Sequence, residues 1–110
     1  MIEIIVLNYL NEKLSVPAYM EKPERPPKRY VLIEKVGGTR ENFINTATVT
    51  LQSYAESLFL AATINEEVKV AMDNLIELDS VGSSHYNTDY NFTDTDKKKY
   101  RYQAIYHITY

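Results

Sequence analysis

Residues 53–79, SYAESLFLAATINEEVKVAMDNLIELD, form the stretch that decides the fold. Apolar side chains recur in it at alternating steps of three and four residues, which places them on one face of an α-helix. These side chains are Leu58, Ala61, Ile64, Val68, Ala71, Leu75 and Leu78, and the stripe is widened by Ala62 and Met72. Ser53 followed by Glu56 has the spacing of a capping box. We therefore expect one helix, straight or bent, over Ser53 to Asp79.

The opposite face of this helix is strongly acidic. It carries Glu56, Glu66, Glu67, Asp73, Glu77 and Asp79 against the single cation Lys69. Cations gather before and after the helix, at Lys22, Arg25, Lys28, Arg29, Lys35 and Arg40 and again at Lys97, Lys98, Lys99 and Arg101. The net charge of -3 therefore hides a separation of charge. Opposite patches on one small domain can meet on neighbouring copies, and the alternative is solvated faces that happen to segregate.

A β-hairpin is expected directly before the helix. Residues 29–36, RYVLIEKV, are rich in β-branched and aromatic side chains and predict a strand. The pair Gly37-Gly38 is expected to reverse the chain. In residues 43–52 Ala47, Val49 and Leu51 alternate with threonines, which predicts a second strand with one buried and one wet face.

A second strand pair is expected after the helix. Residues 83–92 are polar but compatible with a strand, residues 93–99 predict a turn, and residues 100–110 alternate regularly. Six of the ten tyrosines lie in this region, at Tyr86, Tyr90, Tyr100, Tyr102, Tyr106 and Tyr110. One face of one strand cannot bury so many rings and still pair every hydroxyl. We therefore expect some of them, Tyr102 and Tyr106 included, at an interface, or with hydroxyls reaching solvent at the strand ends.

The first residues complete the predicted fold. Apolar residues at helical spacing predict a short helix over residues 1–14, and all four prolines follow between Val16 and Arg29. Residues 18–20 are expected to pair as a short edge strand. The whole chain of 110 residues then forms a single α+β domain. Its elements follow the order α-β-β-α-β-β, with two helices on one face of a mainly antiparallel sheet of four to five strands.

The composition argues against an enzyme. The chain has no cysteine, which excludes disulfides and thiolate metal sites. Its two histidines, His85 and His107, each stand alone in a predicted strand without a nucleophile or carboxylate at a recognised spacing. The aspartates of residues 89–96 lack the glycine and the final glutamate of a calcium loop. We predict no catalytic residue, no cofactor and no metal, and we expect a soluble protein because no apolar run could cross a bilayer.

Nucleic-acid binding is the alternative function. Residues 97–110, KKKYRYQAIYHITY, interleave cations with aromatic rings on a strand, as sheet platforms that stack bases do. Against this, the glycines of the RNA-recognition signature are absent, and the acidic helix would repel a phosphate backbone.

Three features resemble a known family. They are the strand and turn YVLIEKVGG, the passage from strand to helix TVTLQSYAES, and the tyrosine-rich terminal strand. From about Val16 onward the chain is similar to the tail-terminator, or head–tail joining, proteins of long-tailed phages and prophages of Gram-positive bacteria. The resemblance implies a structural protein of the virion tail or neck, assembled in the host cytoplasm. It also implies a ring, generally a hexamer, that caps the tube of major tail protein, contacts the head connector and leaves a channel for DNA.

The charged residues suggest where such a ring would form. We place Glu66, Glu67, Asp73 and Glu77 on the acidic face and Lys97, Lys98, Lys99 and Arg101 on the basic one. The acidic residues would lie either at the channel, where they keep passing DNA from sticking, or against the cations of a neighbour, where they set register and association rate.

Overall fold

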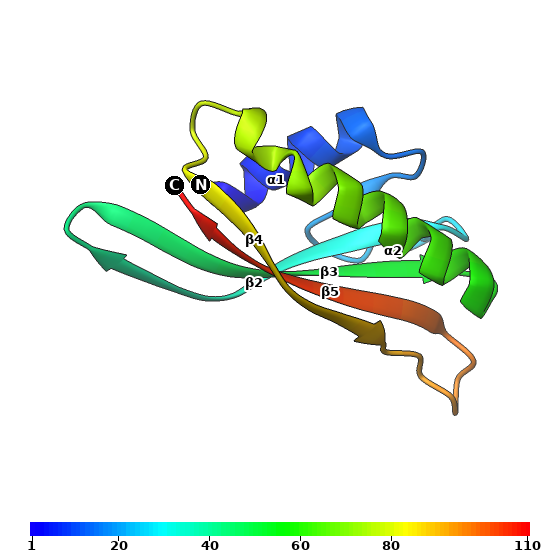
Figure 1. The fold of residues 1–110 in the computed structure, drawn as a ribbon. Coiled ribbons are helices and arrows are strands. Elements are labelled where there is room, and N and C mark those ends of the chain that lie inside the picture. The colour runs from blue at the N-terminus through cyan, green and yellow to red at the C-terminus, as the bar shows by residue number, and fades with distance from the viewer.

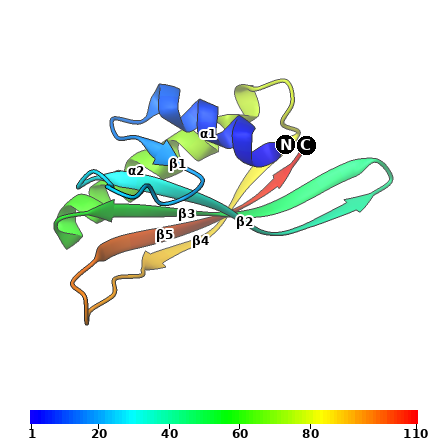
Figure 2. The same ribbon diagram turned by 180° about the vertical axis from the view of Figure 1, so that it is seen from behind.

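The fold is a five-stranded sheet with a layer of two helices on one side. The computed structural model describes all residues from Met1 to Tyr110. Along the chain the elements are α1 (Ile2–Lys13), β1 (Ala18–Tyr19), β2 (Tyr30–Glu41), β3 (Ile44–Ala55), α2 (Leu58–Asp73), the 3-10 turn η1 (Leu75–Glu77), β4 (Ser83–Asn91) and β5 (Tyr100–Thr109). Figures 1 and 2 show α1 and α2 side by side over the same face of the sheet. The predicted α+β class is confirmed.

The strand order is β1-β2-β3-β5-β4. β1 pairs in parallel with β2, and all other neighbours are antiparallel. The short edge strand expected near residue 18 is therefore present, and the two predicted hairpins share one sheet. β5 is an inner strand, which explains why it has the most regular alternation in the sequence.

The core lies between the helices and this sheet. From the sheet it takes alternate residues of the inner strands, such as Val49, Leu51 and Ala104, and from α1 it takes residues such as Val6 and Leu10. The alternation predicted for residues 43–52 is confirmed on this side. The opposite face of β3 is less exposed to solvent than expected, because Thr50 on that face is also buried.

The central helix is shorter than predicted. Ser53 and Ala55 still belong to β3, where they pair with Tyr102 and Tyr100 of β5, so the expected cap at Ser53 is wrong. The helix begins at Leu58, and Ser57 caps it by accepting a hydrogen bond from the Leu60 amide. Strand pairing with β5 has overridden a local capping signal.

The helix also ends before Asp79. The Asn74 side chain donates to the Val70 carbonyl, which also accepts a hydrogen bond from the Asn74 backbone amide at the end of the helix. α2 stops at Asp73, and the chain tightens into η1. Leu75 is nevertheless buried, so the apolar stripe that predicted the helix continues past its end into η1.

The first hairpin turns later than predicted. Gly37 and Gly38 lie inside β2, where neither has a positive φ, and a bulge between Lys35 and Gly37 shifts the register. The chain reverses at Asn42 and Phe43, whose φ values of 50° and 64° match a two-residue turn of type I′. Gly38 is needed for a different reason, since a Cβ there would lie 2.7 Å from the Thr46 carbonyl oxygen of β3.

Candidate interaction surfaces

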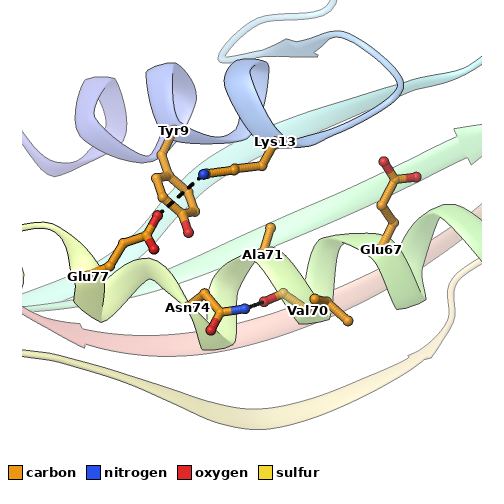
Figure 3. Close-up of a pocket in the computed structure, with 7 residues that line it drawn as sticks. All are labelled: Tyr9, Lys13, Glu67, Val70, Ala71, Asn74 and Glu77. Atoms are coloured by element: carbon orange, nitrogen blue, oxygen red, sulfur yellow. Dashed lines mark hydrogen bonds and ion pairs between the residues drawn. The ribbon is translucent and has the colours of Figure 1, made fainter.

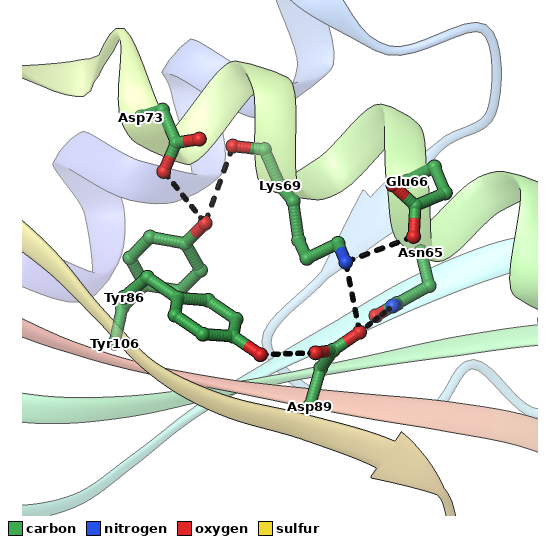
Figure 4. Close-up of polar contacts among 7 residues, drawn as sticks. All are labelled: Asn65, Glu66, Lys69, Asp73, Tyr86, Asp89 and Tyr106. Atoms are coloured by element: carbon green, nitrogen blue, oxygen red, sulfur yellow. Dashed lines mark hydrogen bonds and ion pairs between the residues drawn. The ribbon is translucent and has the colours of Figure 1, made fainter.

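A polar network fastens α2 to β4. Lys69 of α2 lies 3.0 Å from the Asp89 carboxylate of β4 and 2.8 Å from Glu66 on its own helix (Figure 4). Only 22% of the Lys69 side chain and 16% of the Asp89 side chain are exposed. Asn65 and Tyr86 also donate hydrogen bonds to the Asp89 carboxylate. The only cation of the acidic helix is therefore used within the chain.

Burial and hydrogen bonding act in opposite directions on Asp89. Burial alone would raise its pKa, but the hydrogen bonds from Tyr86, Lys69 and Asn65 outweigh burial and hold that pKa below its usual value. Glu66 and then Asp89 raise the pKa of Lys69. Both groups of the pair are therefore charged at neutral pH.

Tyr106 occupies the other half of this network. It is completely buried, and its hydroxyl donates to the Asp73 carboxylate at 2.9 Å and to the Lys69 carbonyl (Figure 4). Burial, followed by Asp73, raises the pKa of the Tyr106 phenol. Tyr106 thus offers no surface to a partner, contrary to the interface position predicted for it. Tyr102 is half-buried and packs against the core.

A groove separates the two helices. Tyr9 and Lys13 of α1 line one wall, and Val70, Ala71, Asn74 and Glu67 of α2 with Glu77 of η1 line the other (Figure 3). Its volume is about 360 Å³. We call it the interhelical groove. At one end Lys13 pairs with Glu77 at 3.5 Å, and both side chains are about half exposed.

Tyr9 forms the buried wall of the interhelical groove. Burial, and after it the carboxylate of Glu77, raises the pKa of the Tyr9 phenol to about 12. Glu67 anchors the end of α1 instead of pointing to solvent, because its carboxylate accepts hydrogen bonds from the Ser15 amide and hydroxyl. The groove therefore combines an apolar lining with two carboxylates and one cation.

The predicted basic residues Lys97, Lys98 and Lys99 lie away from the interhelical groove, at one end of the sheet. The turn that carries Lys97, Lys98 and Lys99 joins β4 to β5 and hangs below the helical layer in Figure 1. None of the three lysines forms an ion pair within the chain, where the ion pairs involve Lys13, Arg29 and Lys69 alone. Nearby Lys22 lowers the pKa of Lys99. Lys22 and Lys99, from distant parts of the sequence, thus lie close together, and the Asp94 carboxylate of the same turn opposes the effect of Lys22.

An aromatic strip crosses the helix-free face of the sheet beside this turn. The Arg101 guanidinium lies 4.4 Å from the centre of the ring of Phe92, which directly follows β4, and 5.8 Å from that of Tyr54 of β3. Tyr54 in turn stacks on Tyr30 of β2, with ring centres 4.7 Å apart. Arg101 also donates to the Tyr54 hydroxyl. Arg101 is therefore built into the sheet, whereas Lys97, Lys98 and Lys99 before it form no ion pair within the chain.

The first hairpin extends beyond the helical layer as an arm. Every residue from Lys35 to Ile44 is exposed, and we call this segment the arm. Figures 1 and 2 show it projecting past the ends of β4 and β5. At its tip Phe43 is 89% exposed and Ile44 is 56% exposed. Phe43 also adopts a left-handed conformation, which costs a bulky L-residue about 1–2 kcal/mol.

The structure does not bring the predicted acidic and basic residues together. Glu66, Glu67, Asp73 and Glu77 each contact a partner on or beside α1 and α2 or in the core beneath them. The lysine turn is on another part of the molecule. Any contact between the two sets has to be between different chains.

Sequence reasoning missed two features. The Lys69–Asp89 pair joins residues twenty positions apart in the sequence, and no short-range spacing reveals it. The arm tip was missed because Gly37-Gly38 drew the expected turn away from Asn42, although an asparagine at a hairpin turn is itself a recognised signal.

The two histidines are neighbours, not isolated residues. His85 of β4 lies directly opposite His107 of β5, and Thr48 of β3 is within hydrogen-bond distance of His107 Nδ1 at 3.0 Å. No group of three or more histidine, aspartate or glutamate side chains is placed to hold a metal ion. Both histidines lie on the helix-free face and are exposed.

The sequence matches no known protein family, and a search of curated proteins finds no similar sequence. None of the helices has the length and apolar composition needed to span a membrane. The fold and its surfaces therefore carry the functional argument.

Proposed function

We propose that this protein is a structural subunit of a phage tail or neck, which assembles into a ring that terminates the tail tube and joins it to the head connector. It acts by binding alone: to its own copies, to the major tail protein and to connector proteins, while DNA only passes through the channel. Its place is the virion.

One observation carries the proposal: strong surface charge of opposite sign lies at separate places on one small domain. The three lysines of the β4–β5 turn form no ion pair within the chain, although Asp94 and Asp96 share that turn, and Glu66, Glu67, Asp73 and Glu77 lie around α2. Two unlike surfaces on one subunit favour head-to-tail contacts, which close into a ring when the rotation between copies allows it. Charge of this kind directs partner choice and association rate.

The lysine turn is the best place to test the proposal. Replacing Lys97, Lys98 and Lys99 together by glutamate removes no ion pair of the chain, so the fold should persist, and circular dichroism checks this. We expect the variant to lose binding to purified tail tubes in negative-stain images. The triple glutamine variant should show an intermediate loss. Normal capping of tubes by the glutamate variant would refute the proposal.

A nucleic-acid-binding module is the second candidate, and the aromatic strip favours it. Arg101, Phe92 and Tyr54 lie on an open sheet face beside an unpaired lysine turn, an arrangement that suits stacked bases and phosphates. A filter-binding titration against single-stranded and duplex DNA separates the two candidates. Micromolar binding that falls steeply with salt supports the module, and its absence supports the assembly protein.

A further inference from the structure

The arm tip is unfavourable for an isolated chain in two respects. Phe43 exposes almost all of its ring to water, and it holds a left-handed backbone conformation that suits asparagine or glycine. Strain at an exposed position points to a function at that position. The adjacent Ile44 and, further back, Val36 add more exposed apolar surface to the same arm.

The interhelical groove has the properties that such a tip requires. Its volume of about 360 Å³ falls within the range of about 300–1,000 Å³ that is typical of ligand pockets. Three of its seven lining residues are apolar: Val70, which is 62% exposed, and Tyr9 and Ala71, which are nearly buried. An aromatic ring that entered it would exchange water for contacts with these three apolar side chains.

The charges of the two surfaces are complementary. The groove carries Glu67 and Glu77 against Lys13, and the arm carries two cations, Lys35 and Arg40, against Glu41. The groove therefore has one excess negative charge, and the arm has one excess positive charge. This difference would orient an approaching arm with its cationic strand next to the carboxylates.

The arm cannot reach the groove of its own chain. Its two strands are paired along their length, from Gly38 with Ala47 to Glu41 with Ile44. Figure 1 shows it pointing away from the helical layer. We infer that the arm tip, Phe43 with Ile44, docks into the interhelical groove of a second copy of this chain. The contact is head-to-tail, so each copy gives one tip and receives another.

This inference rests on the proposed self-association and names the two surfaces that meet. Because the chain has no cysteine, disulfide trapping can test it cleanly. Ile44→Cys protein, which keeps the Phe43 ring, is labelled with nitrogen-15, mixed with unlabelled Val70→Cys protein and oxidised with diamide. Mass spectrometry then counts mixed and symmetric disulfides. We expect the mixed product to form at least tenfold faster than the product of Ile44→Cys with Phe59→Cys.

Phe59 makes a suitable control because it is also strongly exposed, at 78%, but lies at the other end of α2 from the groove. Equal rates for the two mixtures would overturn the inference. Faster formation of the symmetric Ile44→Cys product would also overturn it, because that product requires tip-to-tip contact.

A second measurement does not depend on cysteine chemistry. Phe43→Gly keeps a residue suited to the left-handed turn and removes the ring, so the fold should be retained. In sedimentation experiments self-association should weaken about ten- to a hundredfold, and Phe59→Ala should leave it unchanged. Wild-type association of Phe43→Gly would refute the contact. Tail tubes capped normally without the preferred disulfide would contradict this inference alone, and the preferred disulfide without tube binding would contradict the proposed function alone.

Discussion

Replacing Lys69 by methionine tests whether the polar network holds α2 on the sheet. Methionine keeps much of the aliphatic stem and removes the charge. At the 3.0 Å separation from Asp89 the attraction is about 5.5 kcal/mol for an effective dielectric constant of about 20. Part of this lost attraction is offset in the variant, because methionine, unlike the lysine ammonium, loses no charge hydration when the protein folds. Removing one partner of a buried pair typically costs about 3–5 kcal/mol, and the partial exposure of this pair lowers the expected loss to about 2–3 kcal/mol.

The chain offers a matched control at Lys13. The same substitution there breaks the pair with Glu77, whose side chains are about half exposed, and such pairs contribute at most about 1 kcal/mol. Urea titrations followed by circular dichroism give both free energies of unfolding. Lys69→Met should also lower the melting temperature by about 10 °C.

The pH dependence provides an independent check. The folded-state pKa of Asp89 is below the usual value of 3.8, so its pairing stabilises the native state above about pH 4 and is lost as the pH falls through the lower folded-state value. In Lys69→Met this contribution is reduced at neutral pH, and at low pH Asp89 is protonated in both proteins. The difference in stability between them should therefore be largest near neutrality and should narrow below about pH 4. Equal losses for Lys69→Met and Lys13→Met, or a difference independent of pH, would refute the reasoning.

Three further predictions concern the backbone and the tyrosines. Gly38→Ala should cost about 1–3 kcal/mol in urea titrations because its Cβ would meet a backbone carbonyl, whereas Gly37→Ala, with nothing within 4 Å, should be nearly neutral. Ser57→Ala should cost about 1 kcal/mol through loss of the helix cap, whereas Ser53→Ala should cost less because its buried hydroxyl has no partner; the opposite order would restore the cap predicted from the sequence. Tyr9 has a folded-state pKa raised from 10 to about 12, so about 3 kcal/mol of stability should be lost as the pH rises across that interval, and an unchanged slope in Tyr9→Phe would contradict this assignment.

Local periodicity predicted the elements well and their ends less well. The alternation of residues 100–110 and the helical stripe around Val68 identified β5 and α2, because both patterns report burial on one side. Ser53 failed as a cap because its pairing partner, Tyr102, lies almost fifty residues away. Gly38 failed as a turn residue because its role is close contact across two strands.

The surfaces were less predictable than the fold. The acidic and basic segments were visible in the sequence, but the sequence could not show that Glu67 anchors α1 or that Asp73 binds Tyr106. These contacts depend on how α2 lies on the sheet. The exposure of Phe43 was equally hidden, since it follows from an arm that no helix covers.

The arm separates partner binding from core packing, two requirements that often fall on the same residues in a small domain. Its residues lie outside the packed interior, so a change at Phe43 or Asn42 alters what the hairpin offers without disturbing Leu51 or Val68 in the middle. The length and the side chains of the arm could therefore change during evolution while the packed domain keeps its melting temperature. Related chains with the same core and a different arm tip are expected to bind different neighbours.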